Sequence, residues 1–501
     1  MKIDSQTVAR LQDESGIGFS GNQVPSATGA ATGIANGTAN GAATGIANGA
    51  GTGTANGTAN GAATGTANGA GTANGAATGA TNGTAAAAGE VRDITLAPSG
   101  EKKIAWAWRN MPLLRAIKED FERTKPFAGV KIALSVHMEA KTACLCRTLA
   151  AGGAEMHATG CNPLSTQDDV AAALAAGGIP VYAWRGSTAE EYERHLTMAL
   201  ESGPNIIIDD GGDLITILHT KLQHLIPDVY GGCEETTTGI MRLFSMAMDK
   251  KLKFPMIAVN NAQCKYLFDN RYGTGQSVWD GINRTTNLVV AGKNVVIAGY
   301  GWCGKGIAMR AKGFGAKVII TEIDPVKALE AMMDGFQVMP MDLAVEIGDL
   351  FITATGCCDV ITERHFGKIK DGAILCNAGH FNVEVDIAWL DNNVSKFEQK
   401  PSITGYKFED GKTLFVLAEG RLVNLASGDG HPVEIMDMSF AIQALSAQFL
   451  VENHKNLAPG VIPVPKDIDH DVARKKLAAC GLSIDALTAD QAKYLLCWEM
   501  E

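Results

Sequence analysis

The N-terminal part of the chain lacks charged residues. No Asp, Glu, Lys or Arg lies between Ser15 and Gly89, and from Gly29 to Gly89 the sequence is almost entirely Ala, Thr, Gly and Asn. Such a composition cannot bury enough apolar surface to offset the entropy that is lost on ordering. We therefore expect residues 1–89 to form a disordered segment, and nothing in their composition indicates a function.

The chain also has few features of membrane, secreted or metal-binding proteins. No run approaches the roughly 18 apolar residues of a membrane-spanning helix, and Asp4, Asp13 and Glu14 interrupt the region where a secretion signal would stand. The 11 cysteines include no C-x-x-C pair, which argues against zinc sites and disulfides. A net charge of −11 argues against a general nucleic-acid binder. We expect a cytoplasmic protein with reduced thiols, no metal, and no membrane or nucleic-acid partner.

From Glu90 onward, short apolar runs alternate with amphipathic stretches. Most of the runs are continuously apolar, which is typical of parallel strands that are covered on both faces. Helical patterns lie between many of them, for example at 167–176 and 305–312. The sequence therefore predicts an α/β fold with doubly wound sheets, with strands at 131–136, 180–184, 206–209, 255–260, 294–298, 317–321, 350–355, 373–377 and 414–417.

A dinucleotide-binding motif follows one of these runs. Gly299, Gly301 and Gly304 form a G-x-G-x-x-G pattern between an apolar strand and a helix, and Glu322 ends the next strand. The glycines allow a tight turn, a close approach to a pyrophosphate and helix–strand packing, and the helix N-terminus attracts phosphate. A carboxylate at Glu322 accepts hydrogen bonds from a ribose diol and repels a 2′-phosphate. The motif therefore predicts NAD rather than NADP as the cofactor.

Other polar clusters follow expected strands, at 137–142, 209–213, 353–357 and 377–380, and a further one at 234–239 stands before a helix. In a further cluster, Lys265 and Asp269 are four residues apart, on one face of a helix. His380 follows a strand whose carboxyl end borders the ligand crevice of an open α/β sheet. Strand-end carboxylates, a histidine and a Lys/Asp pair are together what oxidation and proton abstraction at a sugar carbon require.

With these residues the chain from about Glu90 to Trp498 resembles the S-adenosylhomocysteine hydrolases. The resemblance rests on strings such as C-N-P-L-S-T-Q-D at 161–168, E-E-T-T-T-G at 234–239, G-H-F at 379–381 and G-H-P at 430–432. It implies reversible cleavage of S-adenosylhomocysteine to adenosine and homocysteine with tightly bound NAD. Oxidation of the ribose 3′-OH acidifies the C4′ proton, homocysteine leaves, water adds at C5′, and the ketone is reduced again. It also implies that the protein is a homotetramer and that it acts in the methyl cycle.

The resemblance implies roles for individual residues. Lys265 and Asp269 would assist oxidation at the 3′-OH, and a lysine in such surroundings can be tuned toward acting as a base. The implied catalytic set is His137, Asp210, Glu235, Lys265, Asp269 and His380. The implied substrate contacts near the purine are Glu139, Lys141, His431 and Phe440. The implied cofactor contacts are Thr236, Thr237, Thr238, Asn270, Gly299, Gly301, Gly304, Glu322, Thr355 and Asn424.

The implied domain order places a split substrate-binding domain around the cofactor domain. We expect residues 90–275 to form its first part, 276–432 the NAD-binding domain, 433–475 the return segment, and 476–501 a short C-terminal segment. The two domains would enclose a closable cleft.

Three departures from the family pattern leave alternatives open. Glu139 and Lys141 replace a Thr and a Glu near the purine, Lys327 replaces an Asn near the adenine ribose of NAD, and we expect no basic, Tyr-rich C-terminal tail. Because a lysine only donates hydrogen bonds, it suits a 6-oxo group better than a 6-amino group. The substrate could therefore be S-inosylhomocysteine. Alternatively, Glu139 could restore recognition of adenine, or Lys141 could pair with Glu139 and leave the pocket. A dehydrogenase that releases NADH and a non-catalytic regulatory paralogue are further alternatives.

Overall fold

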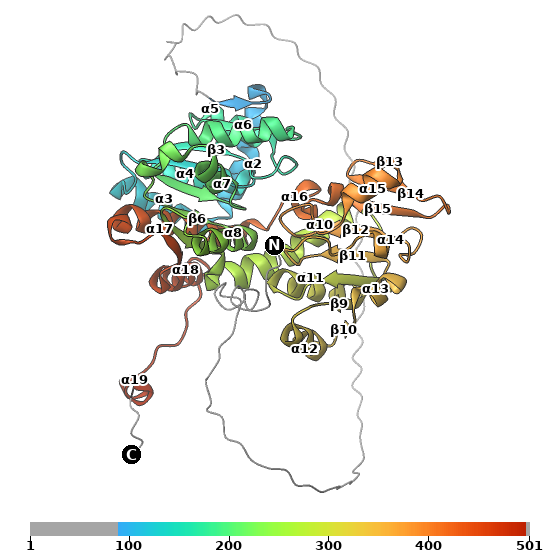
Figure 1. Cartoon of the computed structure of the whole chain (residues 1–501). Coiled ribbons are helices and arrows are strands. Elements are labelled where there is room, and N and C mark those ends of the chain that lie inside the picture. Colours follow the sequence, from blue (N-terminus) through green and yellow to red (C-terminus); the bar gives the residue numbers. More distant parts are fainter. Residues whose placement is uncertain (1–88, 497–501) are drawn as a thin grey trace, which may run out of the picture. The chain divides into compact units, whose positions relative to one another are not determined.

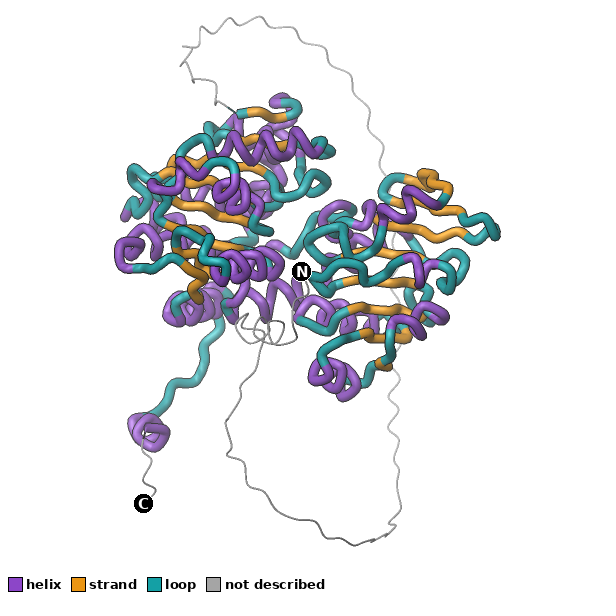
Figure 2. The backbone as a smooth tube through the Cα atoms, in the orientation of Figure 1, coloured by secondary structure: helices purple, strands orange, loops and turns teal. Residues whose placement is uncertain are grey.

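Two sheets organise residues 89–496, the part of the chain that the computed structural model describes (Figure 1). Each sheet has helices on both of its faces, as the tube view in Figure 2 shows. The predicted doubly wound α/β class is thereby confirmed. The segment predicted to be disordered, 1–89, lies outside the described residues except for Gly89.

The first sheet is entirely parallel, in the order β1-β4-β3-β2-β5-β6-β7-β16. Its strands bury alternate residues against different helices, because side chains of a strand point to opposite faces. Ile206 and Ile208 join one core cluster, and Ile207 joins the other. The strands are β1 (Glu90–Val91), β2 (Lys131–Ser135), β3 (Glu155–Thr159), β4 (Val181–Ala183), β5 (Ile206–Asp209), β6 (Gly231–Glu234), β7 (Pro255–Ala258) and β16 (Gly460–Pro463).

Helices from distant parts of the chain cover this sheet. The 21-residue helix α17 (Val433–Asn453) is buried on most sides and joins the same core cluster as Ile206 and Ile208. The remaining helices of this half are α2 (Ala97–Arg109), α3 (Pro112–Thr124), α4 (Ala140–Ala151), α5 (Asp168–Ala176), α6 (Ala189–Leu200), α7 (Asp213–Thr220), α8 (Thr237–Met248), α9 (Gln263–Lys265) and α18 (Lys466–Ala479).

The second sheet has the order β10-β9-β8-β11-β12-β15-β14-β13. Its first six strands run parallel, and β14 and β13 extend it as antiparallel strands. The strands are β8 (Asn294–Ala298), β9 (Lys317–Thr321), β10 (Gln337–Val338), β11 (Leu350–Thr353), β12 (Ile374–Asn377), β13 (Ser395–Lys400), β14 (Ile403–Lys407) and β15 (Thr413–Leu417). The helices are α10 (Thr274–Thr286), α11 (Trp302–Gly313), α12 (Pro325–Met333), α13 (Met341–Ile347), α14 (Glu363–Phe366), α15 (Ile387–Asn393) and α16 (Val423–Ala426).

The chain leaves the first sheet once and returns to it. β16 comes after every strand of the second sheet in sequence, yet it pairs with β7. The expected boundary at 475 falls inside α18, which continues to Ala479, and α19 (Ala489–Leu496) is the last helix. No described helix is long and apolar enough to cross a membrane.

Candidate active site

A buried lysine is the centre of one group of polar side chains. Lys265 is 5% exposed, and its Nζ lies 3.3 Å from Asp269 Oδ1 and 3.5 Å from Glu235 Oε1. The ammonium donates to the side-chain oxygens of Asn270 at 2.8 Å and Asn260 at 3.2 Å. We call these five residues the lysine network. Its charges and hydrogen-bonding groups are almost fully shielded from water.

A π-helix brings two of these partners to the lysine. Residues Tyr266–Gly273 adopt this wider helix directly after α9. In an α-helix the residue four positions on faces the first residue, and the fifth turns away. The i→i+5 spacing of a π-helix lets Asp269 and Asn270 both reach Lys265. The expected proximity of Lys265 and Asp269 is therefore present, but the helix is not the α-helix that the spacing indicated.

Burial and charge pairing shift the pKa values in the lysine network. Burial opposes charge on Lys265, but Asp269 and Glu235 outweigh it and raise its pKa. Burial also acts against the charged form of Asp269, and Lys265 and His431 nevertheless hold the pKa of Asp269 well below its usual range. For Glu235 burial wins over Lys265 and raises the pKa to about 7. The network therefore holds a fixed ion pair and one carboxyl group that exchanges its proton near neutral pH.

Side chains of α17 brace the network from the returning part of the chain. Ser439 Oγ donates to Asp269 Oδ2 at 2.8 Å, and Gln443 Nε2 donates to Glu235 Oε2 at 2.5 Å. Sequence reasoning missed both residues, because a helix that is buried on most sides has no polar face to mark them. It also missed Asn260, although its place at the end of the predicted strand 255–260, two residues after β7, was a usable signal.

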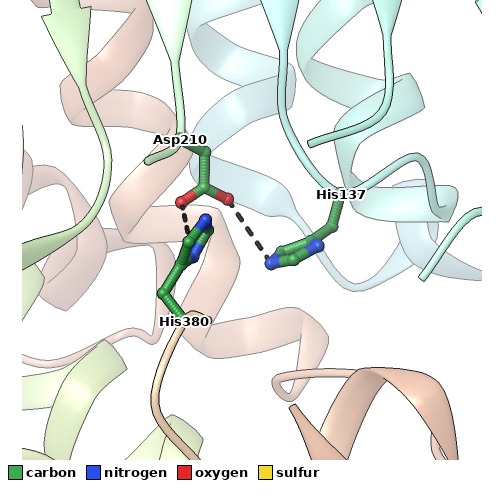
Figure 3. A group of neighbouring side chains, drawn as sticks. All are labelled: His137, Asp210 and His380. Carbon is green, nitrogen blue, oxygen red and sulfur yellow. Dashed lines mark ion pairs between the residues drawn. The ribbon is translucent and has the colours of Figure 1, made fainter. Parts of the chain in front are cut away.

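A second group of side chains draws on both sheets. His137 follows β2, Asp210 follows β5, and His380 follows β12. Asp210 Oδ2 lies 3.5 Å from His137 Nε2, and Asp210 Oδ1 lies 3.7 Å from His380 Nδ1 (Figure 3). We call these three residues the histidine group. Burial lowers the pKa of His137 to about 4, so its ring is neutral at pH 7.

The histidine group also has the spacing of a metal site. One ligand atom from each residue lies within 4.8 Å of the others, the single such grouping among residues 89–496. Two imidazoles and one carboxylate suit a divalent transition metal. The same atoms suit exchange of a proton between His137 and Asp210, and the expectation of no metal stays a prediction.

The residues expected near the purine lie in different surroundings. Lys141 Nζ lies 2.7 Å from Glu139 Oε2 and donates to the Asp429 carbonyl oxygen at 2.7 Å. His431 Nδ1 is 3.0 Å from Asp269 Oδ1, so this ring adjoins the lysine network. Phe440 is 1% exposed and packs in the core cluster around α17. The structure thus brings Glu139 and Lys141 together and leaves Phe440 inside the core.

The G-x-G-x-x-G loop has the shape that a dinucleotide requires. Gly299 has φ +94°, a conformation that glycine tolerates best. A Cβ on Gly304 would lie 2.0 Å from the Gly299 carbonyl oxygen, whereas a Cβ on Gly301 would meet no atom within 4 Å. The open space at Gly301 and the start of α11 at Trp302 fit the pyrophosphate of NAD. Glu322 directly follows β9 beside this loop and accepts a hydrogen bond from the Tyr300 amide at 2.6 Å.

The other expected cofactor residues border both sheets. Thr355 is held by Glu384, whose carboxylate accepts from its amide at 2.9 Å and its hydroxyl at 2.7 Å. Asn424 is buried and its Oδ1 has no hydrogen-bond partner, which leaves an acceptor for a ligand. Asn270 belongs to the lysine network. The last three expected cofactor residues, Thr236, Thr237 and Thr238, lie at the N-terminus of α8. These groups fit NAD in chemistry, and their contacts with it stay predictions.

Comparisons with known proteins place these features in one family. A protein-family model described as S-adenosyl-L-homocysteine hydrolase matches residues 89–230, and another, described as the NAD binding domain of that enzyme, matches residues 270–430. The chain is 59% identical over 412 residues to an adenosylhomocysteinase of Thermococcus kodakarensis, covering 82% of this chain and 97% of the relative. It is 56% identical over 410 residues to an S-inosyl-L-homocysteine hydrolase of Methanocaldococcus jannaschii, covering 82% of this chain and 99% of the relative.

Proposed function

Since the chain belongs to the S-adenosyl-L-homocysteine hydrolase family, we propose that it catalyses the reversible hydrolysis of S-adenosyl-L-homocysteine to adenosine and L-homocysteine. The observation that supports this most is the lysine network beside the histidine group. The lysine network binds and deprotonates the hydroxyl that is oxidised, and the histidine group transfers protons at the neighbouring carbons. A hydrolase that works through temporary oxidation needs both.

The lysine network acts on the ribose 3′-OH. When bound, NAD would supply the acceptor for the hydride of the 3′ carbon and the donor for its return. Because paired carboxylates raise its pKa, Lys265 acts as a hydrogen-bond donor that stabilises negative charge on the 3′ oxygen. Glu235, whose pKa is raised to about 7, accepts a proton near neutral pH. Asp269 fixes Lys265, and Ser439 fixes Asp269.

The histidine group acts at C4′ and C5′ of the ribose. Asp210 removes the C4′ proton, which the 3′ carbonyl has made acidic, and the C5′–S bond breaks as homocysteine leaves. In the second half, water forms a bond to C5′ while one of its protons passes to His137 Nε2. The electron pair of the C4′=C5′ bond moves onto the 3′ carbonyl, and C4′ then regains a proton. His380 Nδ1 lies 3.7 Å from Asp210 Oδ1, and we assign His380 to the homocysteine end of the substrate.

Turnover measurements test this proposal directly. The holoenzyme is incubated with S-adenosylhomocysteine while free thiol and the absorbance of the bound cofactor are followed. A hydrolase releases homocysteine and keeps its cofactor. Free NADH accumulating with substrate would instead identify a dehydrogenase, and no turnover of any nucleoside thioether would leave the non-catalytic paralogue.

A second substrate, S-inosyl-L-homocysteine, is favoured by the surroundings of Lys141. Glu139 and the Asp429 carbonyl engage two of its three N–H groups, which leaves one donor for a ligand. A 6-oxo group accepts from that donor, whereas a 6-amino group leaves it unsatisfied at a cost of about 1–3 kcal/mol. Relatives of similar identity carry both names, including the S-inosyl-L-homocysteine hydrolase of Methanocaldococcus jannaschii.

Base specificity is decided by comparing kcat/KM for the two substrates in wild type and Lys141→Glu. We expect wild type to accept the inosyl compound at least as well as the adenosyl compound, and the variant to move toward adenosyl by about tenfold or more. An adenosyl preference above about a hundredfold in wild type, equivalent to about 2.7 kcal/mol, would contradict the second substrate.

We further propose a cytoplasmic homotetramer with the domain division 90–275, 276–432 and 433–475. Self-association is supported by exposed apolar side chains on α12 and just before it, among them Ile323, Val326, Leu329 and Met333. Sedimentation of the holoenzyme measures the oligomeric state, and a monomer at micromolar concentration would contradict it. Lys327, 3.7 Å from Asp324, remains a candidate for altered NAD affinity.

A further inference from the structure

The ring of His137 has different neighbours on its two nitrogen atoms. On one side, Nδ1 lies 2.8 Å from Ser165 Oγ and 3.2 Å from Cys161 Sγ. On the other side, Nε2 faces Asp210 Oδ2 at 3.5 Å, longer than a good hydrogen bond. Ser165 and Cys161 are 3% and 4% exposed. The mechanism proposed above uses only the Nε2 side, so the contacts of Nδ1 need an explanation of their own.

The hydroxyl and the thiol that face Nδ1 both donate hydrogen bonds to other acceptors. Ser165 Oγ donates to the Asn162 carbonyl oxygen at 3.0 Å, and Cys161 Sγ donates to Asp210 Oδ2 at 3.3 Å. Each hydroxyl or thiol has one proton to donate, so both atoms face Nδ1 as acceptors. A proton on Nδ1 satisfies all four contacts at once. A proton on Nε2 instead would force Ser165 to give up Asn162 and would gain only the long contact to Asp210.

We propose that Ser165 is a positioning residue that fixes His137 in the Nδ1–H tautomer, so that Nε2 keeps a free lone pair on the side of Asp210. This inference rests on the proposed function and deepens it. A neutral imidazole can take a proton only at its unprotonated nitrogen. Ser165 therefore determines that the ring accepts the proton from water on the side where Asp210 lies. Cys161 adds a second, weaker acceptor.

Tautomer measurements test this without relying on activity. Two-bond ¹H–¹⁵N spectra of the ¹⁵N-histidine-labelled holoenzyme report which nitrogen carries the proton, and loss of one signal in His137→Gln assigns the ring. We expect Nδ1–H in wild type and in Ser165→Thr, which keeps the hydroxyl. In Ser165→Ala we expect a mixture of tautomers. A wild-type His137 ring with its proton on Nε2 would overturn the proposal even if neither Ser165 variant folds.

Partial reactions separate this role from a general loss of structure. In Ser165→Ala the rate at which bound NADH appears should stay within about twofold of wild type. The rates of solvent-deuterium incorporation at C4′ and of overall hydrolysis should fall by at least about tenfold, which is the low end of what acid–base catalysis contributes. Ser165→Thr should recover most of this loss. Ser446→Ala serves as the matched control, because it removes a buried hydroxyl at a different place in the fold, on α17.

The outcomes distinguish this inference from the proposed function. If wild type cleaves no nucleoside thioether, the proposed function fails, while the tautomer spectra still decide the assignment. If wild type is active and Ser165→Ala keeps every partial rate and the Nδ1–H signal, the positioning role is wrong and the proposed function stands. Equal slowing of NADH formation and of hydrolysis in Ser165→Ala would show a structural role only.

Discussion

The lysine network and the histidine group differ in how they are assembled. Every member of the lysine network comes from the half of the chain that forms the first sheet, and α17 braces it with further hydrogen bonds. The histidine group takes His380 from the second sheet, and its two contacts with Asp210 measure 3.5 and 3.7 Å. The side chains of the lysine network therefore all come from the part of the chain that forms the first sheet, whereas the histidine group also depends on where the second sheet places His380.

The difference indicates how the two chemical steps respond to change. A network buried in one domain is pre-organised and loses much when one charge is removed, because its partners stay buried and unpaired. A group that spans two domains has longer contacts, and each partner contributes less. Variants that change one region at a time test whether the two regions respond differently.

Removing the central charge should have the largest effect. Lys265→Ala leaves Asp269 and Glu235 without their cation, so we expect turnover to fall by about 10²–10³-fold, the loss typical when one donor to a developing negative charge is removed. Pre-steady-state absorbance should show that formation of bound NADH is the slowed step. Lys102→Ala, at an exposed position of α2, is the control. Normal NADH formation followed by a later block would show that Lys265 has another role.

The two regions should respond to pH in opposite directions. The pKa of Glu235 is raised to about 7, so the folded state holds a proton that the unfolded state releases near pH 4.5, and stability falls as pH rises across this interval. The pKa of His137 is lowered to about 4 from 6.5, so its contribution is lost as pH falls through that interval. Each shift corresponds to about 3 kcal/mol.

Urea unfolding of wild type, Glu235→Gln and His137→Gln at pH 5 and pH 8 measures these contributions. Relative to wild type, Glu235→Gln should be more stable at pH 8 than at pH 5, and His137→Gln should be more stable at pH 5 than at pH 8. Parallel pH profiles for the three proteins would contradict both shifts.

Removing the residue from the second sheet should cost less than removing Lys265. His380→Ala deletes one partner of Asp210 at 3.7 Å, so we expect hydrolysis to slow by about 10–100-fold. Formation of bound NADH should stay close to wild type in a stopped-flow measurement. If oxidation slows as much as hydrolysis, the two regions are not separable as described.

The smallest effect is expected from the brace on α17. Ser439→Ala removes the hydrogen bond to Asp269 Oδ2, and a bond to a charged group contributes about 1.5–3 kcal/mol in full burial. Because Asp269 keeps Lys265 and His431, we expect a loss near the lower figure, seen as a roughly tenfold slower NADH formation. Ser446→Ala on the same helix should change nothing. Equal behaviour of the two variants would exclude the brace.

Many of the strands and the cofactor loop could be predicted from local sequence. The nine predicted strands are present because long apolar runs are visible without knowledge of their neighbours. β6 was missed because its residues, Gly231–Glu234, include two glycines, and β13 because all its residues are polar or exposed. The G-x-G-x-x-G loop was visible because its function depends on the backbone at three positions that lie within six consecutive residues.

What the sequence determined by itself was the set of chemical groups: a buried-strand pattern, a dinucleotide loop, and polar residues at strand ends. The tertiary structure decided how these groups meet. It alone brought Ser439 and Gln443 beside Asp269 and Glu235, placed Asn270 on Lys265 through a π-helix, and set Ser165 against His137. The physical reason is that local patterns follow from a few neighbouring residues, whereas contacts between side chains from distant segments depend on the packing of the whole chain.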